Sequence, residues 1–390
     1  MIWEIVFWVS LFLLAHTYVF FPLIMWFRGR NKPLNDLIFK NKPEELPTIS
    51  ILLSVYNEEE VIRKKIESTF NTSYPADKIE FLIGSDASTD RTNQIIEQYR
   101  KVYPQIKLFP FSERTGKAGI INFLAQKANH EILVLTDAKV FFTQGTLYHL
   151  VKHFKNAGIS VVGGCLVNKN WEKDGISYQE KRYFQQENLI KHYEGVLWGT
   201  MIGAFGACYA IRAKDYSPIP SNFYGDDFFI TMQALEKGQK SVNELEAICY
   251  EEVTNASSEE FRRKVRISIG NFQNLLRFKN LLWPSNPGLA FSFFSHKVLR
   301  WMGPFLILLA LISNALILGD GALYMLTFIL QLIGVTAPIW DRILKLGGFH
   351  NKIIRFISHF YLMNLALLTG FLRFIKGTDS SIWEPTQRTF

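Results

Sequence analysis

Acidic residues that could bind a metal, or hydroxyl groups beside a phosphate, recur in three short motifs along the middle of the chain. The motifs are Ser85-Asp86-Ala87-Ser88-Thr89-Asp90, Thr136-Asp137-Ala138-Lys139 and Gly225-Asp226-Asp227. Each lies at the end of an apolar run typical of a β-strand, or shortly after one. Ligands of open α/β sheets bind beyond the carboxyl ends of the strands. The motifs therefore predict a site for a ligand that carries phosphate, metal or several hydroxyl groups.

The first two motifs each suggest a role for one carboxylate. Asp86 could accept hydrogen bonds from ribose hydroxyls or a base N–H group, while Asp86 or Ser88 could equally cap the helix that follows. Asp137 could ligate Mg²⁺ or Mn²⁺ shared with phosphates. A purely structural Asp137 is disfavoured, because a carboxylate at the end of a buried strand is costly unless it is paired. A second acid two residues later would strengthen the metal interpretation, but Lys139 stands there.

The third motif places two carboxylates side by side before a predicted helix. Adjacent acids beside the aromatic residues that follow, Phe228 and Phe229, can have separated pKa values, which would suit one of them to act as a general base. The alternative is that Asp226 only caps the helix.

Two further segments could bind a nucleotide. Ser54-Val55-Tyr56-Asn57-Glu58 ends a predicted strand, so its amides could hold a nucleotide while Glu58 reaches a base or ribose; the alternative is a helix cap by Asn57. Arg114-Thr115-Gly116-Lys117-Ala118-Gly119 precedes a helix, where two cations and two glycines suit a diphosphate. Its spacing is not that of a P-loop. A solvated basic turn is the alternative.

The elements that would position these residues alternate between strands and helices. Strands are predicted at residues 48–56, 79–84, 106–109, 132–136 and 206–212, and helices at 58–70, 89–103 and 117–128. Such alternation predicts βαβ units and a mostly parallel sheet. Asn57, Asp86 and Asp137 then fall at the carboxyl ends of neighbouring strands.

Long apolar segments bracket this region. Residues 5–27 are too long for a signal-peptide core and show no small-residue cleavage site, which predicts a retained anchor. Arg28, Arg30 and Lys32 follow, so the positive-inside rule places the middle domain in the cytoplasm of a bacterial-type inner membrane. Residues 301–318 and 322–340 carry no charge and are each just long enough to span. Residues 357–371 could span or lie in the interface.

The basic residues lie mainly beside the apolar segments. The net charge of +8 therefore indicates anionic lipid headgroups as partners rather than nucleic acid. Ser257-Ser258-Glu259-Glu260 resembles a capping box that opens a helix with an apolar face and scattered arginines. We expect this helix to lie on the inner leaflet; a core-packed helix with a solvated basic side is the alternative. The three cysteines are odd in number and not in metal-ligand spacing, which fits a reduced compartment.

These segments divide the chain into five parts. Residues 1–28 form the anchor, 45–255 an α/β domain, 256–298 amphipathic interfacial helices, 299–375 transmembrane or interfacial helices, and 376–390 a tail.

Taken together, the motifs resemble membrane-integrated family 2 glycosyltransferases, the group with cellulose, hyaluronan and poly-N-acetylglucosamine synthases. The likeness runs over residues 48–278. It is carried by an ordered set, namely Tyr56-Asn57-Glu58, Asp86 with Ser88 and Asp90, Gly116-Lys117 with Asn122, Asp137, residues 203–212 and Gly225-Asp226-Asp227.

The resemblance implies an α/β domain of the GT-A type, which is a Rossmann-like nucleotide-sugar fold, flanked by transmembrane helices. It implies an inverting transfer from a UDP-sugar with Mg²⁺ or Mn²⁺ as cofactor. Asp137 would bind the metal, and Asp227 would deprotonate the acceptor hydroxyl with Asp226 beside it. The residues expected to bind the donor are Tyr56, Glu58, Asp86, Arg114, Lys117, Asp137, Lys139, Arg263 and Arg266.

Two departures from the family pattern refine the expected function. Lys139 replaces the usual second acid of the metal motif and could neutralise phosphate charge itself. The Gln-x-x-Arg-Trp signature of processive members has its nearest match at Arg263-Lys264-Val265-Arg266-Ile267, which lacks Gln and Trp. We therefore expect the addition of one sugar to a lipid-linked or membrane-presented acceptor. A processive polymer synthase and an inactive nucleotide-binding scaffold are the alternatives.

Overall fold

The computed structural model describes residues 1–169, 177–252, 257–283, 286–349 and 351–377. These residues separate into two compact units, each described by itself below. The α/β unit comprises residues 25–169 and 180–252, and the helical unit contains the remaining described residues. The predicted tail at 376–390 lies almost wholly outside the described residues, and so do the side chains of the predicted capping box apart from Glu260.

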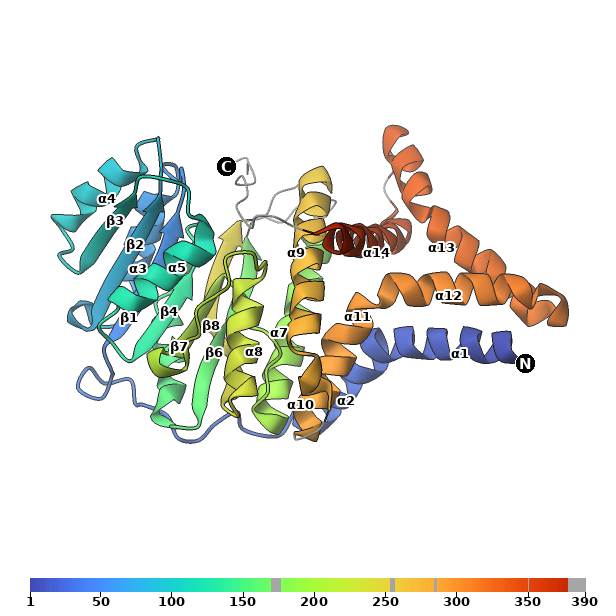
Figure 1. Ribbon diagram of the computed structural model, residues 1–390, viewed down its shortest axis with the longest axis horizontal. Coiled ribbons are helices and arrows are strands. Elements are labelled where there is room, and N and C mark those ends of the chain that lie inside the picture. Colours follow the sequence, from blue (N-terminus) through green and yellow to red (C-terminus); the bar gives the residue numbers. More distant parts are fainter. Residues whose placement is uncertain (170–176, 253–256, 284–285, 350, 378–390) are drawn as a thin grey trace. The chain divides into compact units, whose positions relative to one another are not determined.

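The described strands form one eight-stranded sheet in the order β3-β2-β1-β4-β7-β6-β8-β5 (Figure 1). The strands are β1 Ile49–Val55, β2 Ile79–Asp86, β3 Ile106–Phe111, β4 Ile132–Thr136, β5 Val140–Phe142, β6 Ile159–Lys169, β7 Cys208–Arg212 and β8 Lys240–Glu252.

The sequence predicts a mostly parallel sheet, and the structure has a mixed one, in which β1 to β4 form a wholly parallel half. β1 pairs in parallel with β2 and β4, and β2 pairs in parallel with β3. β1 has almost no exposed surface, which is typical of a parallel strand covered on both faces. Helix α5 packs on β1 and β2, and α4 packs on β3. The carboxyl ends of β1, β2 and β4 therefore meet at one edge.

The other half of the sheet brings a later segment to that edge. β7 runs antiparallel to β4, and Cys208 at the start of β7 pairs with Thr136 at the end of β4. β6 is antiparallel to β7 and parallel to β8, while β5 is antiparallel to β8. The segment before β7 thus lies beside Asp137.

The helices of the α/β unit are mostly short. They are α3 Ile62–Phe70, α4 Thr92–Arg100, α5 Gly116–Lys127, α6 Thr146–Val151, α7 Ser177–Trp198 and α8 Asp226–Glu236, with 3₁₀ turns η2 Ala76–Lys78, η3 Lys152–Lys155 and η4 Ala213–Asp215. An apolar core, which includes Ile51, Phe81 and Val134 with no exposed surface, joins the sheet to α3, α4, α6 and α7.

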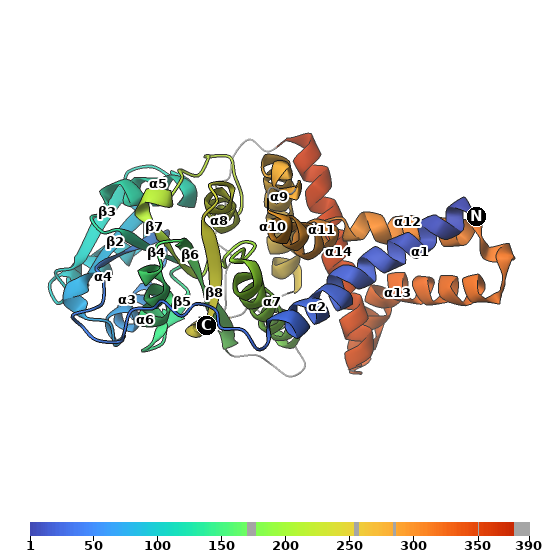
Figure 2. The same cartoon turned by 90° about the horizontal axis from the view of Figure 1, so that it is seen from below.

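The helical unit contains the apolar segments. Its elements are α1 Ile2–Ala15, η1 His16–Phe20, α2 Phe21–Gly29, α9 Ser257–Arg277, η5 Lys279–Leu282, α10 Pro287–Ser292, η6 Phe293–Val298, α11 Leu299–Trp301, α12 Gly303–Leu316, η7 Leu318–Asp320, α13 Ala322–Leu346 and α14 Lys352–Lys376, with the end of α2 assigned to the α/β unit. Helix α1 lies alongside α12 in both views (Figures 1 and 2).

Within the described residues, three helices are long and apolar enough to cross a membrane. They are Ile2–Gly29, Ala322–Leu346 and Lys352–Lys376. The pair Pro287–Trp301 and Gly303–Leu316, bent by 64°, adds a fourth span if it is counted as one. The number matches the three or four segments expected from the sequence.

The apolar face of α9 packs against α14. Val265, Ile269 and Phe272 on this face are buried. The Phe272 ring lies 4.9 Å from the Phe371 ring, and the Ser268 hydroxyl donates a 2.8 Å hydrogen bond to the Leu367 carbonyl. Helix α14 therefore covers much of the apolar face of α9, and the predicted place of α9 on the inner leaflet stays a prediction.

Candidate active site

The loops that follow β1 and β2 are joined by reciprocal hydrogen bonds. The Asn57 amide donates to the Ser88 hydroxyl at 3.1 Å, and the Thr89 amide donates to Asn57 Oδ1 at 2.8 Å. The Glu58 amide donates to Thr92 Oγ1 at 2.8 Å. Ser88 and Thr92 therefore act as partners of the neighbouring loop rather than as caps of their own helix.

Both loops contain a residue in the left-handed region, where residues other than glycine are uncommon. Asn57 has φ 50° and Ala87 has φ 57°. Backbone strain of this kind costs about 1–3 kcal/mol and is found mainly at functional sites. The bonds between the loops hold both residues in this conformation.

Asp86 is buried and accepts three hydrogen bonds from the start of α5. Its donors are the Thr115 amide at 2.5 Å, the Gly116 amide at 3.0 Å and Arg114 Nε at 3.0 Å. The Arg114 guanidinium also lies 3.4 Å from the centre of the Tyr56 ring. Asp86 thus fixes the basic segment after β3, a function that neither sequence interpretation contained.

Lys117 connects two of the acidic motifs. Its ammonium lies 2.9 Å from Asp137 Oδ1 and 3.2 Å from Asp226 Oδ2. Partial burial lowers the pKa of Lys117, but the charges of Asp137, Asp226 and Asp227 outweigh burial and hold the pKa above its ordinary value. The structure therefore gathers residues from α5, β4 and α8 at one point.

Asp227 lies at the start of α8, where a glycine makes room for it. Gly225 precedes the helix with φ 78°, a conformation that glycine adopts readily. A Cβ atom on Gly206 would lie 2.9 Å from Asp227 Oδ2. Burial first and the charge of Asp226 second raise the pKa of Asp227, while Lys117 and Lys191 oppose the shift. A carboxylate with a raised pKa suits a general base.

The remaining predicted residues fall in two places. Lys139 Nζ lies 3.6 Å from Glu58 Oε2, so this lysine pairs with the acid after β1. Arg263 and Arg266 belong to α9 in the helical unit, where Arg263 Nη1 lies 3.6 Å from Glu260 Oε2.

Helix α7 supplies residues that the sequence interpretation missed. Lys191 is 3% exposed, and its ammonium lies 3.4 Å from the centre of the Phe205 ring. Glu194, which has no exposed surface, accepts a 3.0 Å hydrogen bond from the Ile202 amide. The spacing of buried charges on one face of a helix could have indicated them, had the helix been predicted.

The donor set suits a hard divalent cation at Asp137. Its side chain is 44% exposed, and carboxylate oxygens with phosphate and water oxygens are typical ligands of Mg²⁺. Among the described residues, no group of three or more His, Cys, Asp or Glu side chains could hold a metal by itself. A cation here would therefore need further oxygen ligands, such as those of a diphosphate or of water.

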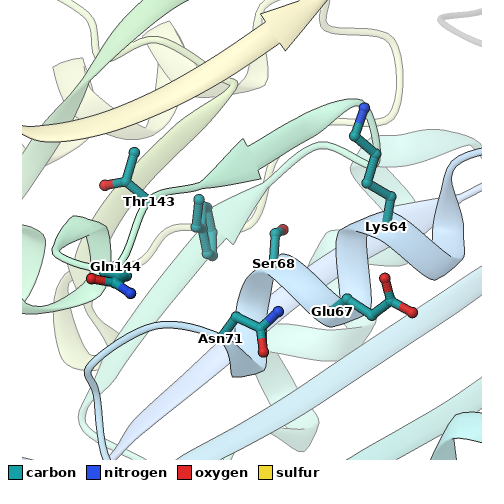
Figure 3. A pocket seen from close by; sticks show the side chains of 7 residues that line it. Lys64, Glu67, Ser68, Asn71, Thr143 and Gln144 are labelled. Atoms are coloured by element: carbon teal, nitrogen blue, oxygen red, sulfur yellow. The ribbon is translucent and has the colours of Figure 1, made fainter.

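A surface depression of about 610 Å³ lies elsewhere, between α3 and the segment after β5 (Figure 3). It is lined by Lys64, Glu67, Ser68, Asn71, Phe142, Thr143 and Gln144. None of the predicted site residues lines it.

Comparison with known proteins identifies a family that this chain resembles. The glycosyl transferase family 2 model matches residues 50–216. The chain is similar to poly-beta-1,6-N-acetyl-D-glucosamine synthase of Staphylococcus epidermidis, at 24% identity over 68% of this chain and 67% of that protein. It is similar to beta-monoglucosyldiacylglycerol synthase of Synechocystis, at 30% identity over 43% of this chain and 36% of that protein.

One solved structure resembles nearly the whole chain. It is the mannosyltransferase PcManGT from Pyrobaculum calidifontis in complex with GDP-Man and Mn²⁺. The TM-score is 0.71 at 20% identity, and the match covers 95% of this chain and 99% of that one. The likeness includes the helical unit and confirms the predicted fold.

Proposed function

We propose that this chain, a family 2 glycosyltransferase with a GT-A fold, transfers one sugar from a nucleoside-diphosphate sugar, most simply a UDP-sugar, to a lipid-linked or membrane-presented acceptor with inversion. The observation that supports this most is the convergence of Lys117, Asp137, Asp226 and Asp227. Residues expected at the diphosphate and the residue expected at the acceptor hydroxyl meet there.

The donor side is formed by the loops after β1, β2 and β3. Glu58 and Tyr56 would face the nucleoside, where Lys139 orients Glu58 by the ion pair. Asp86 would contribute by holding Arg114 against the Tyr56 ring and fixing the start of α5. Arg114, Lys117 and Lys139 would supply positive charge near the diphosphate, which stabilises a leaving group as its negative charge grows.

The acceptor side is formed by α8 and the segment before β7. Asp227 would take the proton from the acceptor hydroxyl as its oxygen attacks the anomeric carbon, while the bond from that carbon to the diphosphate oxygen breaks. A divalent cation at Asp137 would act as a Lewis acid toward the diphosphate.

Single transfer is favoured by Ile267, which stands where processive relatives of this family carry Trp. Ile267 is 40% exposed on α9. The similarity to a poly-N-acetylglucosamine synthase makes a processive polymer synthase the second candidate, and the product length separates the two. A ladder of long chains from purified protein would establish the second.

For location, we propose the inner membrane with the α/β unit in the cytoplasm. The candidate spans support this, since Arg28, Arg30 and Lys32 follow the first span directly.

The decisive experiment is a nucleotide-release screen with purified full-length protein. UDP- and GDP-sugars are tested with and without Mn²⁺, with membrane lipid extract as acceptor. We expect release with one donor, and a loss of about 10²–10⁴-fold in rate for Asp227→Asn, the range for removal of a general base. Asp77→Asn on the exposed turn η2 is the matched control and should keep its activity.

Two results would contradict the proposal. Absence of release with every donor would favour the inactive scaffold. Full activity of Asp227→Asn would move the base to another residue.

A further inference from the structure

We propose that Asp226 is the second carboxylate of the cation site at Asp137, and that Lys117 occupies this site until a divalent cation displaces it. The proposal rests on the proposed function for the identity of the site. The Thr136-Asp137-Ala138-Lys139 motif lacks a second acid, and Asp226 at the start of α8 would supply it.

Asp137 and Asp226 lie close enough to each other to bind the same cation. One ammonium group lies within 3.2 Å of an oxygen of Asp226 and 2.9 Å of an oxygen of Asp137. Both oxygens are therefore within reach of a single small cation. Mg²⁺ prefers oxygen distances of about 2.0–2.1 Å, so each carboxylate would move inward by roughly 1 Å. Both side chains retain solvent-exposed surface, at 44% for Asp137 and 19% for Asp226, so a small rotation can bring them closer.

The acidic side chains around Lys117 outnumber the ammonium group that they contact. The Lys117 ammonium contacts Asp137 and Asp226 directly, and a third acid, Asp227, follows Asp226 in the chain. Lys139, two residues after Asp137, is paired with Glu58. A divalent ion would balance the acidic group better than one ammonium does.

The two carboxylates are held more rigidly than the ammonium group between them. Asp137 follows β4 and Asp226 is the first residue of α8, so two rigid elements hold the two carboxylates. The Lys117 ammonium, in contrast, is at the end of a long flexible side chain. An incoming diphosphate offers that ammonium new oxygens. The lysine can then move to the diphosphate while the carboxylates stay in place to receive the cation.

The test measures Mn²⁺ binding to full-length protein in detergent, without nucleotide, from the electron paramagnetic resonance signal of free Mn²⁺. Lys117→Met should bind Mn²⁺ about tenfold or more tightly than the unmodified protein, because the competing cation is gone. Asp226→Asn should reverse this gain in the double variant, and Asp137→Asn should do the same. Lys139→Met is the matched control, since it removes an equal charge two residues from Asp137, and its affinity should change by less than about twofold.

Three results would overturn the inference. The affinity of Lys117→Met could equal that of the unmodified protein, which would show that Lys117 does not compete. Lys139→Met could tighten binding equally, which would reduce the effect to general electrostatics. The double variant Lys117→Met with Asp226→Asn could keep the gain, which would remove Asp226 from the site. If Lys117→Met does not fold, Lys117→Gln and the single Asp226→Asn variant, which should weaken Mn²⁺ binding, decide the same question.

This outcome is separate from that of the proposed function. Mn²⁺ binding alone requires neither a donor nor an acceptor. Mn²⁺ binding as expected, with no nucleotide release, would support the cation site and contradict the proposed transferase activity. Nucleotide release without the expected changes in Mn²⁺ binding would contradict only the displacement of Lys117 by the cation.

Discussion

At the scale of single residues, the pKa of Asp227 depends on charges from several elements. Asp226 raises its pKa after burial, while Lys117 on α5 and Lys191 on α7 lower it. Lys191 is buried over the Phe205 ring, and Phe205 directly precedes the glycine that backs the Asp227 carboxylate. For the proposed base Asp227, Lys191 would therefore be a positioning residue that favours the ionised form.

The pH dependence of transfer should report this control. A base acts only when deprotonated, so kcat/KM should fall as the pH drops through the pKa of Asp227, which lies above the ordinary aspartate value of 3.8. Lys191→Met should move this acidic limb to higher pH, because a stabilising positive charge is lost. Lys191→Arg should leave the limb in place. A rate profile that is the same for Lys191→Met and the unmodified protein would assign Lys191 to packing alone.

At the scale of elements, the close approach of α8 to the segment before β7 depends on Gly206. An added Cβ would lie 2.9 Å from Oδ2 and 3.2 Å from Cγ of Asp227. The carboxylate of Asp227 would have to shift to accommodate it.

Gly206→Ala should therefore lower kcat while leaving nucleotide affinity unchanged. A displacement of about 1 Å at a reacting group can cost about 10²-fold in rate. Steady-state kinetics and nucleotide titration measure the two quantities. Gly158→Ala is the control, since its Cβ would meet only Asn156 Oδ1 at an ordinary 3.4 Å. An equal loss of nucleotide affinity in Gly206→Ala would point to general unfolding instead.

The parallel half of the fold follows from local sequence, because its strands are apolar runs between clear breaks. β4 lies at Ile132–Thr136 as predicted, and β1 at Ile49–Val55 differs by one residue at each end. Helix α3 begins at Ile62 rather than residue 58, because the intervening backbone is bonded to the loop after β2. No local pattern encodes such a partner.

The rest could not be predicted because its determinants are distant in sequence. Helix α7 was not predicted, because its buried face carries the charged residues Glu187, Lys191 and Glu194, which interrupt the apolar periodicity of a helix. The contact of Lys117 with Asp226 depends on the order β4-β7-β6, which pairs strands from separate parts of the chain. The sequence therefore predicted the candidate residues but not which of them share a cation.

At the scale of the whole molecule, the membrane topology depends on α14, which the sequence left open between spanning and interfacial. Ser268 of α9 bonds to Leu367, and a Cβ on Gly370 would lie 2.3 Å from the Ser268 Cβ atom. Helix α9 carries Arg262, Arg263, Lys264, Arg266 and Arg277. Each such charge costs about 2.5–3.5 kcal/mol at the centre of a bilayer, so α9 and the part of α14 against it should stay near the interface.

We therefore expect Gly377, just after α14, to face the cytoplasm. In intact cells a membrane-impermeant maleimide should label Asp320→Cys in the turn between α12 and α13, but should label Gly377→Cys only after permeabilisation. The parent protein is a suitable background, because two of its free cysteines are buried and the third is half-buried. Labelling of Gly377→Cys in intact cells would instead show that α14 crosses the membrane.

The position of β7 between β4 and β6 also has a consequence for the making of the protein. A chain emerging from the ribosome can pair β1 with β2 and β4 as soon as residue 136 is free, since these strands are close in sequence. The outer edge of β4 then has no neighbour until Cys208–Arg212 is synthesised. An open apolar strand edge invites pairing with other chains. The interval in which β6 and α7 are made is thus the period when the nascent chain is most exposed to aggregation, and Lys117 completes its second ion pair only after that interval has passed.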